Sequence, residues 1–484
     1  MTVTRRDLLM GLGGIAIGAA ATRAVMPGPH AGKEKPAARP NVIVLIADDM
    51  RWDLMGVAGH RIIQTPNLDR LATVNGTLYN NAFVTTSVCP TSRASIMLGQ
   101  KASTHGIWGF NTPFTASQMA RTYHQRLKSE GYRTGFIGKW GVGDVPGQAR
   151  FDYFDGFQNL GHYYPAEKRD QHLTDYHADS AIRFLKESAE PTPYCLTVSF
   201  WAPHAQSNQA ADEMPFDAEL AHVYSNMDIP VPPHYSSIFA DGLPPFMDEQ
   251  WSRTMFERRH TDAEKNQRFT KGYYRLITGM DRAIGRILDA LEQRGDLDNT
   301  LIVFLSDNGF LLGEHGLTGK WLMFEESIRI PMIVKYPRNS ESGDRCAQGI
   351  RSHPVLNIDV APTILTACGI HQPPEMEGVA LQAFEGGRET QSGTPPRAHF
   401  TYEYKLDPFF CLGVRTDRWK LAWYAKAGRT FLYNLLDDPY EQHDRFDDPS
   451  VAPVREHLWQ TLQDEFQGSR LWDEAQISRN GNTR

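Results

Sequence analysis

Five short, mostly apolar runs set the fold class of this chain. They lie at Asn41–Ile46, which reads NVIVLI, and at Thr134–Ile137, Tyr194–Phe200, Leu301–Leu305 and Pro331–Val334. Runs of this kind are typical of strands that are buried on both faces of a sheet. Because segments with helical periodicity alternate with these runs, the pattern predicts an α/β domain.

Three longer segments are predicted to be helices. Gln118–Glu130 and His172–Ser188 have helical periodicity, and within Gln267–Arg294 apolar residues recur along one helical stripe. Such a stripe indicates a helix that packs against a core. Residues 205–265 are instead rich in proline, aspartate and aromatic residues. We therefore expect a long irregular insertion that forms a lid or one wall of a substrate site.

The first 38 residues are predicted to be a signal and linker. Arg5 and Arg6 form a twin-arginine pattern, and an apolar stretch from Leu8 to Ala21 follows. This stretch is too short for a good membrane span and has the form of a signal-peptide core. We expect export by the Tat machinery, which carries folded proteins, to the bacterial periplasm or the medium. An uncleaved N-terminal anchor is the alternative.

The rest of the chain is longer than one core usually holds, so it is predicted to form two parts. Residues 39–385 would form the large domain, and the glycine- and proline-containing segment 385–397 a linker. Short β-type runs and a helical segment at Val454–Glu465 then predict a small α+β domain over 398–484. Its expected antiparallel strands are His399–Tyr404, Leu412–Arg415, Trp419–Tyr424 and Thr430–Asn434.

The composition argues against two classes of protein. The net charge is −7 and the basic residues form no stripe, so nucleic-acid binding is not expected. The five cysteines are few and odd in number, which does not fit a disulfide-stabilised scaffold. One of these cysteines is therefore a candidate for a chemical role.

Cys89 is the strongest candidate for that role. It precedes Pro90, which favours the first turn of a helix, and Gly99 can end that helix. Backbone N–H groups at a helix start favour an anion, and Arg93, four residues later, projects over the same point. The arrangement suits attack on an oxyanion ester. The alternative is a buried cysteine at the start of a core helix, with a surface arginine.

Acidic side chains follow two of the predicted strands. Asp48 and Asp49 end the first run, and Asp307 and Asn308 follow the run at Leu301–Leu305. Ligands gather at the carboxyl ends of strands in α/β sheets. Three carboxylates and an amide oxygen suit Ca²⁺, or less well Mg²⁺, and neither segment has the histidine or cysteine that zinc prefers. A helix cap and a turn are the structural alternatives.

Two lysines and a histidine are candidates for the same centre. Lys139 and Lys320 each lie between a glycine and a tryptophan, in tighter contexts than most surface lysines. His204 follows another predicted strand, where it could give a proton to the leaving group of an ester. A structural role is its alternative. His105 and His315 are weaker candidates for contact with a substrate.

Together these motifs resemble the type I sulfatases of the alkaline phosphatase superfamily. Beyond Cys89 and Arg93, the resemblance includes Pro66–Asp69 (PNLD), Gly413–Leu421 (GVRTDRWKL) and Leu432–Leu435 (LYNL). The order and spacing of the motifs agree over most of the chain. The resemblance implies a large alkaline-phosphatase-like domain, with a mixed, mostly parallel sheet sandwiched by helices. It also implies a small C-terminal α+β domain with an antiparallel sheet.

The resemblance also implies a mechanism. In this family the cysteine that matches Cys89 is converted to formylglycine by a formylglycine-generating enzyme, and one hydroxyl of the hydrated aldehyde attacks sulfur with help from Ca²⁺. Arg93, Lys139 and Lys320 would neutralise the sulfate, and His204 would protonate the leaving alcohol. The residues that match the calcium ligands are Asp48, Asp49, Asp307, Asn308 and the modified Cys89.

The chain departs from the family pattern at two positions. The usual signature has proline two residues after the cysteine, where this chain has Thr91. Many relatives have a histidine two residues after the first lysine, where this chain has Gly141. The first departure bears on the conversion of Cys89. The second bears on turnover of the sulfated intermediate, which another group or water would then assist.

The expected activity is hydrolysis of sulfate esters, on sulfated glycans or on small aryl sulfates. Two alternatives stay open: a phosphonate or phosphate monoester hydrolase on the same fold, and a catalytically silent protein that binds sulfated glycans. Asn308 argues against a two-zinc phosphatase, whose corresponding segment commonly has histidine. Aromatic residues that could line a sugar site, or be ordinary packing, are Trp108, Phe110, Tyr163, Tyr164, Tyr404 and Phe410.

Overall fold

The computed structural model places the described residues in one compact unit. The residues described are 39–481, except 75, 148–149, 159–161, 166–170, 207–211, 236–242, 339–347 and 385–396. The expected signal segment, most of the expected linker and Cys346 lie outside them. The expected boundary between 39–385 and 398–484 remains a prediction. Among the described helices, none is both long and apolar enough to cross a membrane.

An eight-stranded sheet forms the centre of the fold. All its neighbouring strands are parallel except the two pairs that β11 makes, with β7 and β2. The five apolar runs are β1, β4, β6, β7 and β11, so the predicted mixed, mostly parallel sheet is confirmed. From one edge to the other, the strands are β12 (Gly349–Arg351), β2 (Gly76–Tyr79), β11 (Met332–Lys335), β7 (Thr300–Ser306), β1 (Asn41–Asp48), β6 (Tyr194–Pro203), β4 (Arg133–Lys139) and β5 (Tyr153–Phe157).

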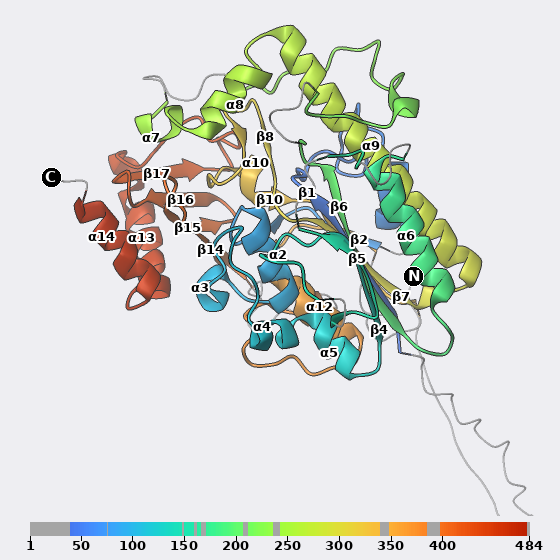
Figure 1. Cartoon of the computed structure of the whole chain (residues 1–484). Coiled ribbons are helices and arrows are strands. Elements are labelled where there is room, and N and C mark those ends of the chain that lie inside the picture. Colours follow the sequence, from blue (N-terminus) through green and yellow to red (C-terminus); the bar gives the residue numbers. More distant parts are fainter. Residues whose placement is uncertain are drawn as a thin grey trace, which may run out of the picture. The chain divides into compact units, whose positions relative to one another are not determined.

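Strand β1 shows why helices cover both faces of this sheet. Its side chains alternate between two cores, with Val42 and Val44 in one and Ile43 and Leu45 in the other. A strand buried on both faces is apolar at successive positions, which accounts for the NVIVLI run. The helices of the first core are α2 (Cys89–Leu98), α5 (Tyr123–Ser129) and α12 (Val360–Ala367), and those of the second are α1 (Pro66–Thr73), α6 (Leu173–Glu187) and α9 (Ala263–Arg294) (Figure 1).

Shorter elements connect these layers. The short strands are β3 (Ala82–Phe83), β10 (Arg329–Ile330) and β13 (Val355–Leu356), which form a small sheet, and β8 (Leu311–Leu312) and β9 (Thr318–Gly319), which pair with each other. The short helices are α3 (Ala102–His105), α4 (Ala116–Arg121), α7 (Pro245–Asp248), α8 (Trp251–Arg259) and α10 (Glu325–Ile328). The 3₁₀ helices are η3 (Ala218–Leu220), η4 (Leu297–Asn299), η5 (Asn357–Asp359), η6 (Leu381–Phe384) and η7 (Pro449–Val451).

Two expectations about helices differ from the structure. The single helix expected over 118–130 is divided into α4 and α5, because Thr122 between them is extended and caps α5. Its hydroxyl accepts a hydrogen bond from the Gln125 N–H, a local bond that threonine favours over a helix interior. The insertion at 205–265 is also less irregular than expected, since it contains α7 and α8.

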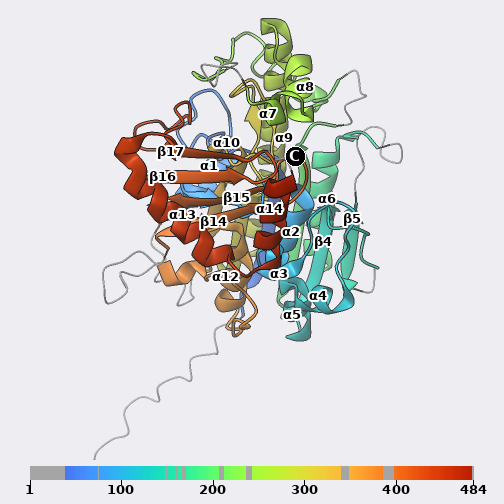
Figure 2. The same cartoon turned by 90° about the vertical axis from the view of Figure 1, so that its left-hand side faces the viewer.

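The C-terminal residues form an antiparallel sheet, as predicted. Leu421 and Trp423 on one face pack against the helices that follow, whereas Ala422 and Tyr424 on the other face join the first core of the large sheet. The helices cover the outer face (Figure 2), and the second of them was not predicted. In sheet order the elements are β14 (His399–Tyr404), β15 (Cys411–Thr416), β16 (Trp419–Tyr424) and β17 (Arg429–Asn434), followed by α13 (Ala452–Phe466) and α14 (Arg470–Gly481).

Gly138, beside Lys139 in β4, has no room for a side chain. A Cβ atom at this position would lie 2.0 Å from the carbonyl oxygen of Ser199 in β6, and the residue has φ +89°. We predict that Gly138→Ala lowers the free energy of unfolding by about 3 kcal/mol or more, because the strands must separate locally. Urea unfolding followed by circular dichroism measures this change.

Gly59→Ala is the matched control for that measurement. Gly59 has φ +94°, but no described heavy atom lies within 4 Å of its Cβ position. The control substitution therefore has only the conformational penalty of a positive φ, about 1 kcal/mol. Equal losses of stability in the two variants would contradict the steric argument.

Candidate active site

The carboxyl ends of four neighbouring strands bring the candidate residues to one edge of the large sheet. Strand β1 ends at Asp48, and Asp307 follows β7, which lies beside β1. The Asp307 N–H donates to the Ala47 carbonyl at 3.0 Å. On the other side of β1, β6 leads to His204 and β4 ends at Lys139. Parallel pairing thus assembles groups that are far apart in sequence.

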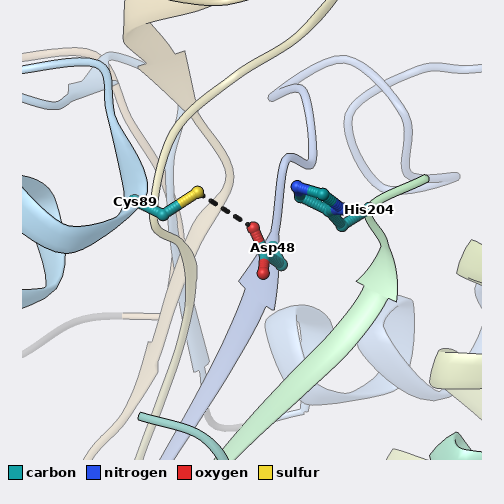
Figure 3. Close-up of side chains that lie close together, drawn as sticks. All are labelled: Asp48, Cys89 and His204. Atoms are coloured by element: carbon teal, nitrogen blue, oxygen red, sulfur yellow. Dashed lines mark hydrogen bonds between the residues drawn. The ribbon is translucent and has the colours of Figure 1, made fainter. Parts of the chain in front are cut away.

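Cys89 is the first residue of α2, at the predicted helix start. Pro90 occupies the first turn, and Gly99 ends the helix in the left-handed region with φ 67°. The Cys89 side chain points to the end of β1 (Figure 3). Its Sγ lies 3.3 Å from Asp48 Oδ1 and 3.9 Å from Asp49 Oδ1. The helix start therefore presents this side chain to two carboxylates.

Arg93 and Lys139 neutralise two of the carboxylates. Arg93 is fully buried, its Nε donates to Asp307 Oδ2 at 2.8 Å, and its Nη2 lies 3.4 Å from Asp48 Oδ2. Lys139 forms an ion pair with Asp48, and its carbonyl accepts a hydrogen bond from Arg93 Nη1 at 2.8 Å. Buried charges of opposite sign in direct contact keep one another ionised.

Lys320 reaches the site from the segment after β9. It forms an ion pair with Asp49, and its Nζ donates to Cys89 Sγ at 2.7 Å. Asp49 itself is in the left-handed region, with φ 67°. Two hydrogen bonds hold it there: its N–H donates to Asp307 Oδ1 at 3.1 Å, and its carbonyl accepts from the Tyr273 hydroxyl in α9. The carboxylate is thus fixed toward Cys89 and Lys320.

Burial and neighbouring charges set the protonation states. Burial raises the pKa of the Cys89 thiol well above its usual range, and Asp307 and Asp48 raise it further. Burial also raises the pKa of Asp307 to about 6, with a contribution from Asp48. Burial alone would raise the pKa of Asp48, but Lys139 and the other nearby cations hold it well below its usual range. At neutral pH the thiol is therefore protonated and both carboxyl groups are ionised.

The donors of this site fit a hard divalent cation. Ligand atoms of Asp48, Asp49, Cys89 and Asp307 lie within 4.8 Å of one another. Asn308 Nδ2 donates to Asp49 Oδ1 at 2.6 Å, whereas its buried Oδ1 has no hydrogen-bond partner among the described residues. An unpaired amide oxygen beside three carboxylates is a donor set that Ca²⁺ and Mg²⁺ prefer. The five side chains therefore have the chemistry of a metal site.

His204 lies across Asp48 from Cys89 (Figure 3). Its Nε2 is 3.6 Å from Asp49 Oδ2, and its Nδ1 is 2.5 Å from the Ala205 carbonyl oxygen. Because a carbonyl only accepts, Nδ1 carries a proton and Nε2 faces the site. Burial lowers the pKa of His204 to about 4, although Asp48 and Asp49 oppose this shift. The imidazole of the free protein is neutral at pH 7.

Two side chains that support the site were not identified from the sequence. Ser199 Oγ donates to the Lys139 carbonyl at 2.7 Å, and Lys139 Nζ lies 5.1 Å from the ring centroid of Trp201. Both residues belong to β6, whose composition is mostly apolar. The alternation of side chains along that strand is the one sequence signal that could have indicated them.

The weaker candidates lie in other surroundings. His105 Nε2 is 3.0 Å from Ser95 Oγ of α2, and His315 is stacked on a phenylalanine ring. Neither contributes a ligand atom to the described group around Cys89. Phe410 packs in the outer core of the C-terminal sheet, so for this aromatic residue ordinary packing is the correct interpretation.

Protein-family models match most of the chain. The sulfatase model matches residues 40–370. The chain belongs to the sulfatase family. A second model, described as the C-terminal part of N-sulphoglucosamine sulphohydrolase, matches residues 313–467. This sulfatase is therefore a sulfuric ester hydrolase of the alkaline phosphatase superfamily.

Relatives and solved structures are similar over nearly the whole length. The N-acetylglucosamine-6-O-sulfatase of Bacteroides thetaiotaomicron is 27% identical over 494 residues, which cover 88% of this chain and 86% of that protein. A solved structure in complex with its substrate D-glucosamine-2-N,6-O-disulfate has a TM-score of 0.74 at 24% identity, covering 90% and 99% of the two chains. The phosphonate monoester hydrolase of Agrobacterium radiobacter has a TM-score of 0.68 at 21% identity, covering 90% and 96%. The predicted fold is confirmed.

Gly141, the second of the expected departures from the family pattern, lies against Arg93. It has φ +75°, and a Cβ atom would lie 2.7 Å from Arg93 Cδ and 3.2 Å from Arg93 Nε. The arginine side chain therefore occupies the space that a side chain at position 141 would need. In this sulfatase a side chain at position 141 would press against Arg93.

We predict that Gly141→Ala lowers kcat/KM for an aryl sulfate by about 10- to 100-fold, because it displaces the arginine from the site. Initial rates over a range of ester concentrations measure this. Gly106→Ala is the matched control, since Gly106 has φ +71° and no described heavy atom within 4 Å of its Cβ position. The control should keep kcat/KM near wild type. An unchanged value in Gly141→Ala would mean that the position of Arg93 does not matter for turnover.

Proposed function

We propose that this sulfatase hydrolyses sulfate esters of sulfated glycans, with Cys89 oxidised to formylglycine and one bound Ca²⁺. The position of Cys89 is the observation that supports this most. At a helix start, its Sγ is 3.3 Å from Asp48 Oδ1 and 2.7 Å from Lys320 Nζ. A nucleophile there adjoins both a cation site and groups that bind an anion. The proposed calcium ligands are Asp48, Asp49, Asp307, Asn308 and the modified Cys89.

The encoded thiol is not a suitable nucleophile by itself. Its raised pKa keeps it protonated at neutral pH. A sulfated thiol would also have no second group on the same carbon to expel the sulfate. Hydrated formylglycine supplies two hydroxyls on one carbon, one to attack sulfur and one to release sulfate. The proposed partner is a formylglycine-generating enzyme that acts on the segment around Cys89, with Thr91 in place of the usual proline.

The charges of the site favour a sulfate ester over a neutral one. The three carboxylates and the three cations balance one another, so a bound divalent ion gives the site a net positive charge. Calcium when bound supplies Lewis-acid polarisation of the reacting oxygens. The lysine and arginine heads are held by the carboxylates within reach of the negative charge that develops on sulfate. These heads belong to Arg93, Lys139 and Lys320.

His204 is the proposed proton donor to the leaving oxygen. Its Nε2 faces the site beside Asp49, while Nδ1 is held by the Ala205 carbonyl. The pKa of about 4 in the free protein keeps it neutral. The negative charge of a bound sulfate ester raises that pKa and favours the protonated form, which gives its proton to the leaving alcohol oxygen. The overall reaction consumes one water and releases an alcohol and sulfate.

Sulfated sugars are the proposed substrates. Two comparisons support this, the similarity to an N-acetylglucosamine-6-O-sulfatase and to a structure with D-glucosamine-2-N,6-O-disulfate as substrate. Small aryl sulfates fit the same charge arrangement. Export by the Tat machinery would bring the enzyme to such glycans in the periplasm or the medium. The twin-arginine segment behind that expectation lies outside the described residues.

The proposed function is tested by turnover of three esters that share a 4-nitrophenol leaving group: the sulfate, the phosphate and the phenylphosphonate. We expect kcat/KM for the sulfate to exceed the other two by about 100-fold or more, and Cys89→Ala to abolish turnover. The Cys89 peptide from active protein should be lighter than the unmodified peptide and react as an aldehyde. N-Acetylglucosamine-6-sulfate then tests the sugar class.

Each other outcome of that comparison selects a different function. Preference for the phenylphosphonate would identify a phosphonate monoester hydrolase, a function found on the same fold. Binding of sulfated sugar without turnover, with Cys89 as an unmodified thiol, would identify a silent binding protein. An unmodified thiol in active protein would contradict the formylglycine mechanism.

Removal of divalent cations is predicted to lower turnover of the sulfate ester by about 100-fold or more, because the site then loses its net positive charge and the Lewis acid that would polarise the attacking oxygen. The measurement is the rate after treatment with a chelator and desalting, with metal content read by mass spectrometry. Added CaCl₂ should restore the rate, and MgCl₂ should restore less. Full activity in protein without calcium would contradict the assigned ligands.

A further inference from the structure

A second cluster of ligating side chains lies away from Cys89. A ring nitrogen of His234, a ring nitrogen of His315 and a carboxylate oxygen of Glu326 lie within 4.8 Å of one another. The three residues are almost completely buried, at 2%, 0% and 3% exposure. They come from the 205–265 insertion, the turn between β8 and β9, and α10. This donor set has two imidazoles and one carboxylate, unlike the oxygen donors at the end of β1.

His315 has an unusual environment for a buried histidine. Neither of its ring nitrogens has a hydrogen-bond partner among the residues that the structure describes. His260, which is equally buried, uses both nitrogens: Nδ1 is 2.8 Å from Asn266 Oδ1 and Nε2 is 3.2 Å from Thr318 Oγ1. A neutral imidazole has one donor and one acceptor, and buried polar groups are normally satisfied. The contrast with His260 points to a partner that is not a protein atom.

The other two members also have unused ligand atoms. His234 Nε2 is 3.0 Å from Glu326 Oε1. In the described part of the chain, His234 Nδ1 and Glu326 Oε2 have no hydrogen-bond partner. Each of the three side chains therefore keeps at least one lone pair or donor site that the protein does not satisfy.

Stacking fixes the two imidazole planes. His315 stacks on Phe324 with ring centroids 4.1 Å apart, and His234 stacks on Tyr440 at 4.7 Å. The backbone also holds the two histidines together, because the backbone N–H of His315 donates to the backbone carbonyl of His234 at 3.0 Å. The His315 backbone is in the left-handed region, with φ 57°. Residues other than glycine are strained in this backbone region, and such residues concentrate at functional sites. The nitrogens are thus held near one point by packing.

The surroundings suit a metal ion and give it a way in. His234 and Glu326 line a cavity of about 530 Å³, together with Tyr440. A cavity of this size has room for water beside the cluster.

We propose that His234, His315 and Glu326 form a zinc site, with water from the cavity as the fourth ligand. Two histidines and one glutamate with an open position are an established zinc donor set. Imidazole also selects zinc and its neighbours over Ca²⁺ and Mg²⁺, which prefer oxygen. The site is separate from the cation site at Cys89, because no ligand is shared.

Zinc at this position would hold three segments that the sequence separates. His315 and Glu326 lie on either side of Lys320, so the ion fixes both ends of the segment that carries this lysine. His234 ties the 205–265 insertion to the same point. The effect on turnover, which rests on the proposed function, is that zinc maintains Lys320 beside Asp49 and Cys89. Zinc binding itself does not depend on that function.

The test measures zinc binding directly, in Cys89→Ala protein so that the thiol cannot bind the metal. The protein is treated with a chelator, dialysed against ZnCl₂ with excess CaCl₂ to occupy the oxygen site, and analysed by mass spectrometry for both metals. We expect about one zinc ion per chain. His315→Asn and Glu326→Gln should reduce this at least tenfold, whereas His260→Gln, the buried and fully hydrogen-bonded control, should not.

Cobalt provides a second measurement that needs no substitution at the cluster. Co²⁺ in the Cys89→Ala protein should give visible ligand-field bands of a four-coordinate site, and added zinc should remove them. Absence of zinc from the calcium-saturated Cys89→Ala protein would overturn the proposal, even if the cluster variants fail to fold. Zinc that persists in folded His315→Asn would overturn it too. Sulfate-ester turnover in metal-replete wild-type protein tests the proposed function separately.

Discussion

The balance between three buried carboxylates and three buried cations is the constraint on which the rest of the structure depends. The carboxylates end β1 and follow β7, while the cations come from α2, β4 and the segment after β9. Removing one partner would leave an uncompensated buried charge, which typically destabilises a protein by about 3–5 kcal/mol. The ion pairs therefore fix α2 against the strand ends as well as preparing the site for an anion.

A second network of buried ion pairs connects α10 to the C-terminal sheet. Glu325, at the start of α10, lies 3.1 Å from Arg415 and 3.0 Å from Lys420 of the C-terminal sheet. Lys420 also lies 2.6 Å from Glu441. Because α10 closes the segment that begins at Lys320, the C-terminal sheet anchors the far end of an active-site segment. Sequence similarity to sulfatases extends into this part of the chain.

The sequence predicted the sheet and the positions of the acidic residues because both signals are local. A continuous apolar run identifies β1, and the aspartates that interrupt it mark its end. Ser199 and Trp201 could not be recognised in the same way, because they lie within the apolar strand β6 and only their side-chain direction gives them a role. The histidine cluster depends entirely on contacts between distant segments, which no local pattern encodes. The helix predicted over 118–130 is divided at Thr122, because the Thr122 hydroxyl accepts a hydrogen bond from the Gln125 backbone N–H and so caps α5.

The burial of Cys89 limits when the proposed oxidation of this side chain could take place. Only 1% of the residue is exposed, and the carboxylates and lysines that enclose it are themselves buried. Under the proposed function, an enzyme that oxidises this side chain would need the surrounding segment in an open form, and would therefore act on the nascent or unfolded chain. If a Tat-type leader carries the finished protein out in its folded state, the order of events is fixed: oxidation, then folding, then translocation. The oxidising enzyme would then have to work in the cytoplasm, although its product would act outside that compartment.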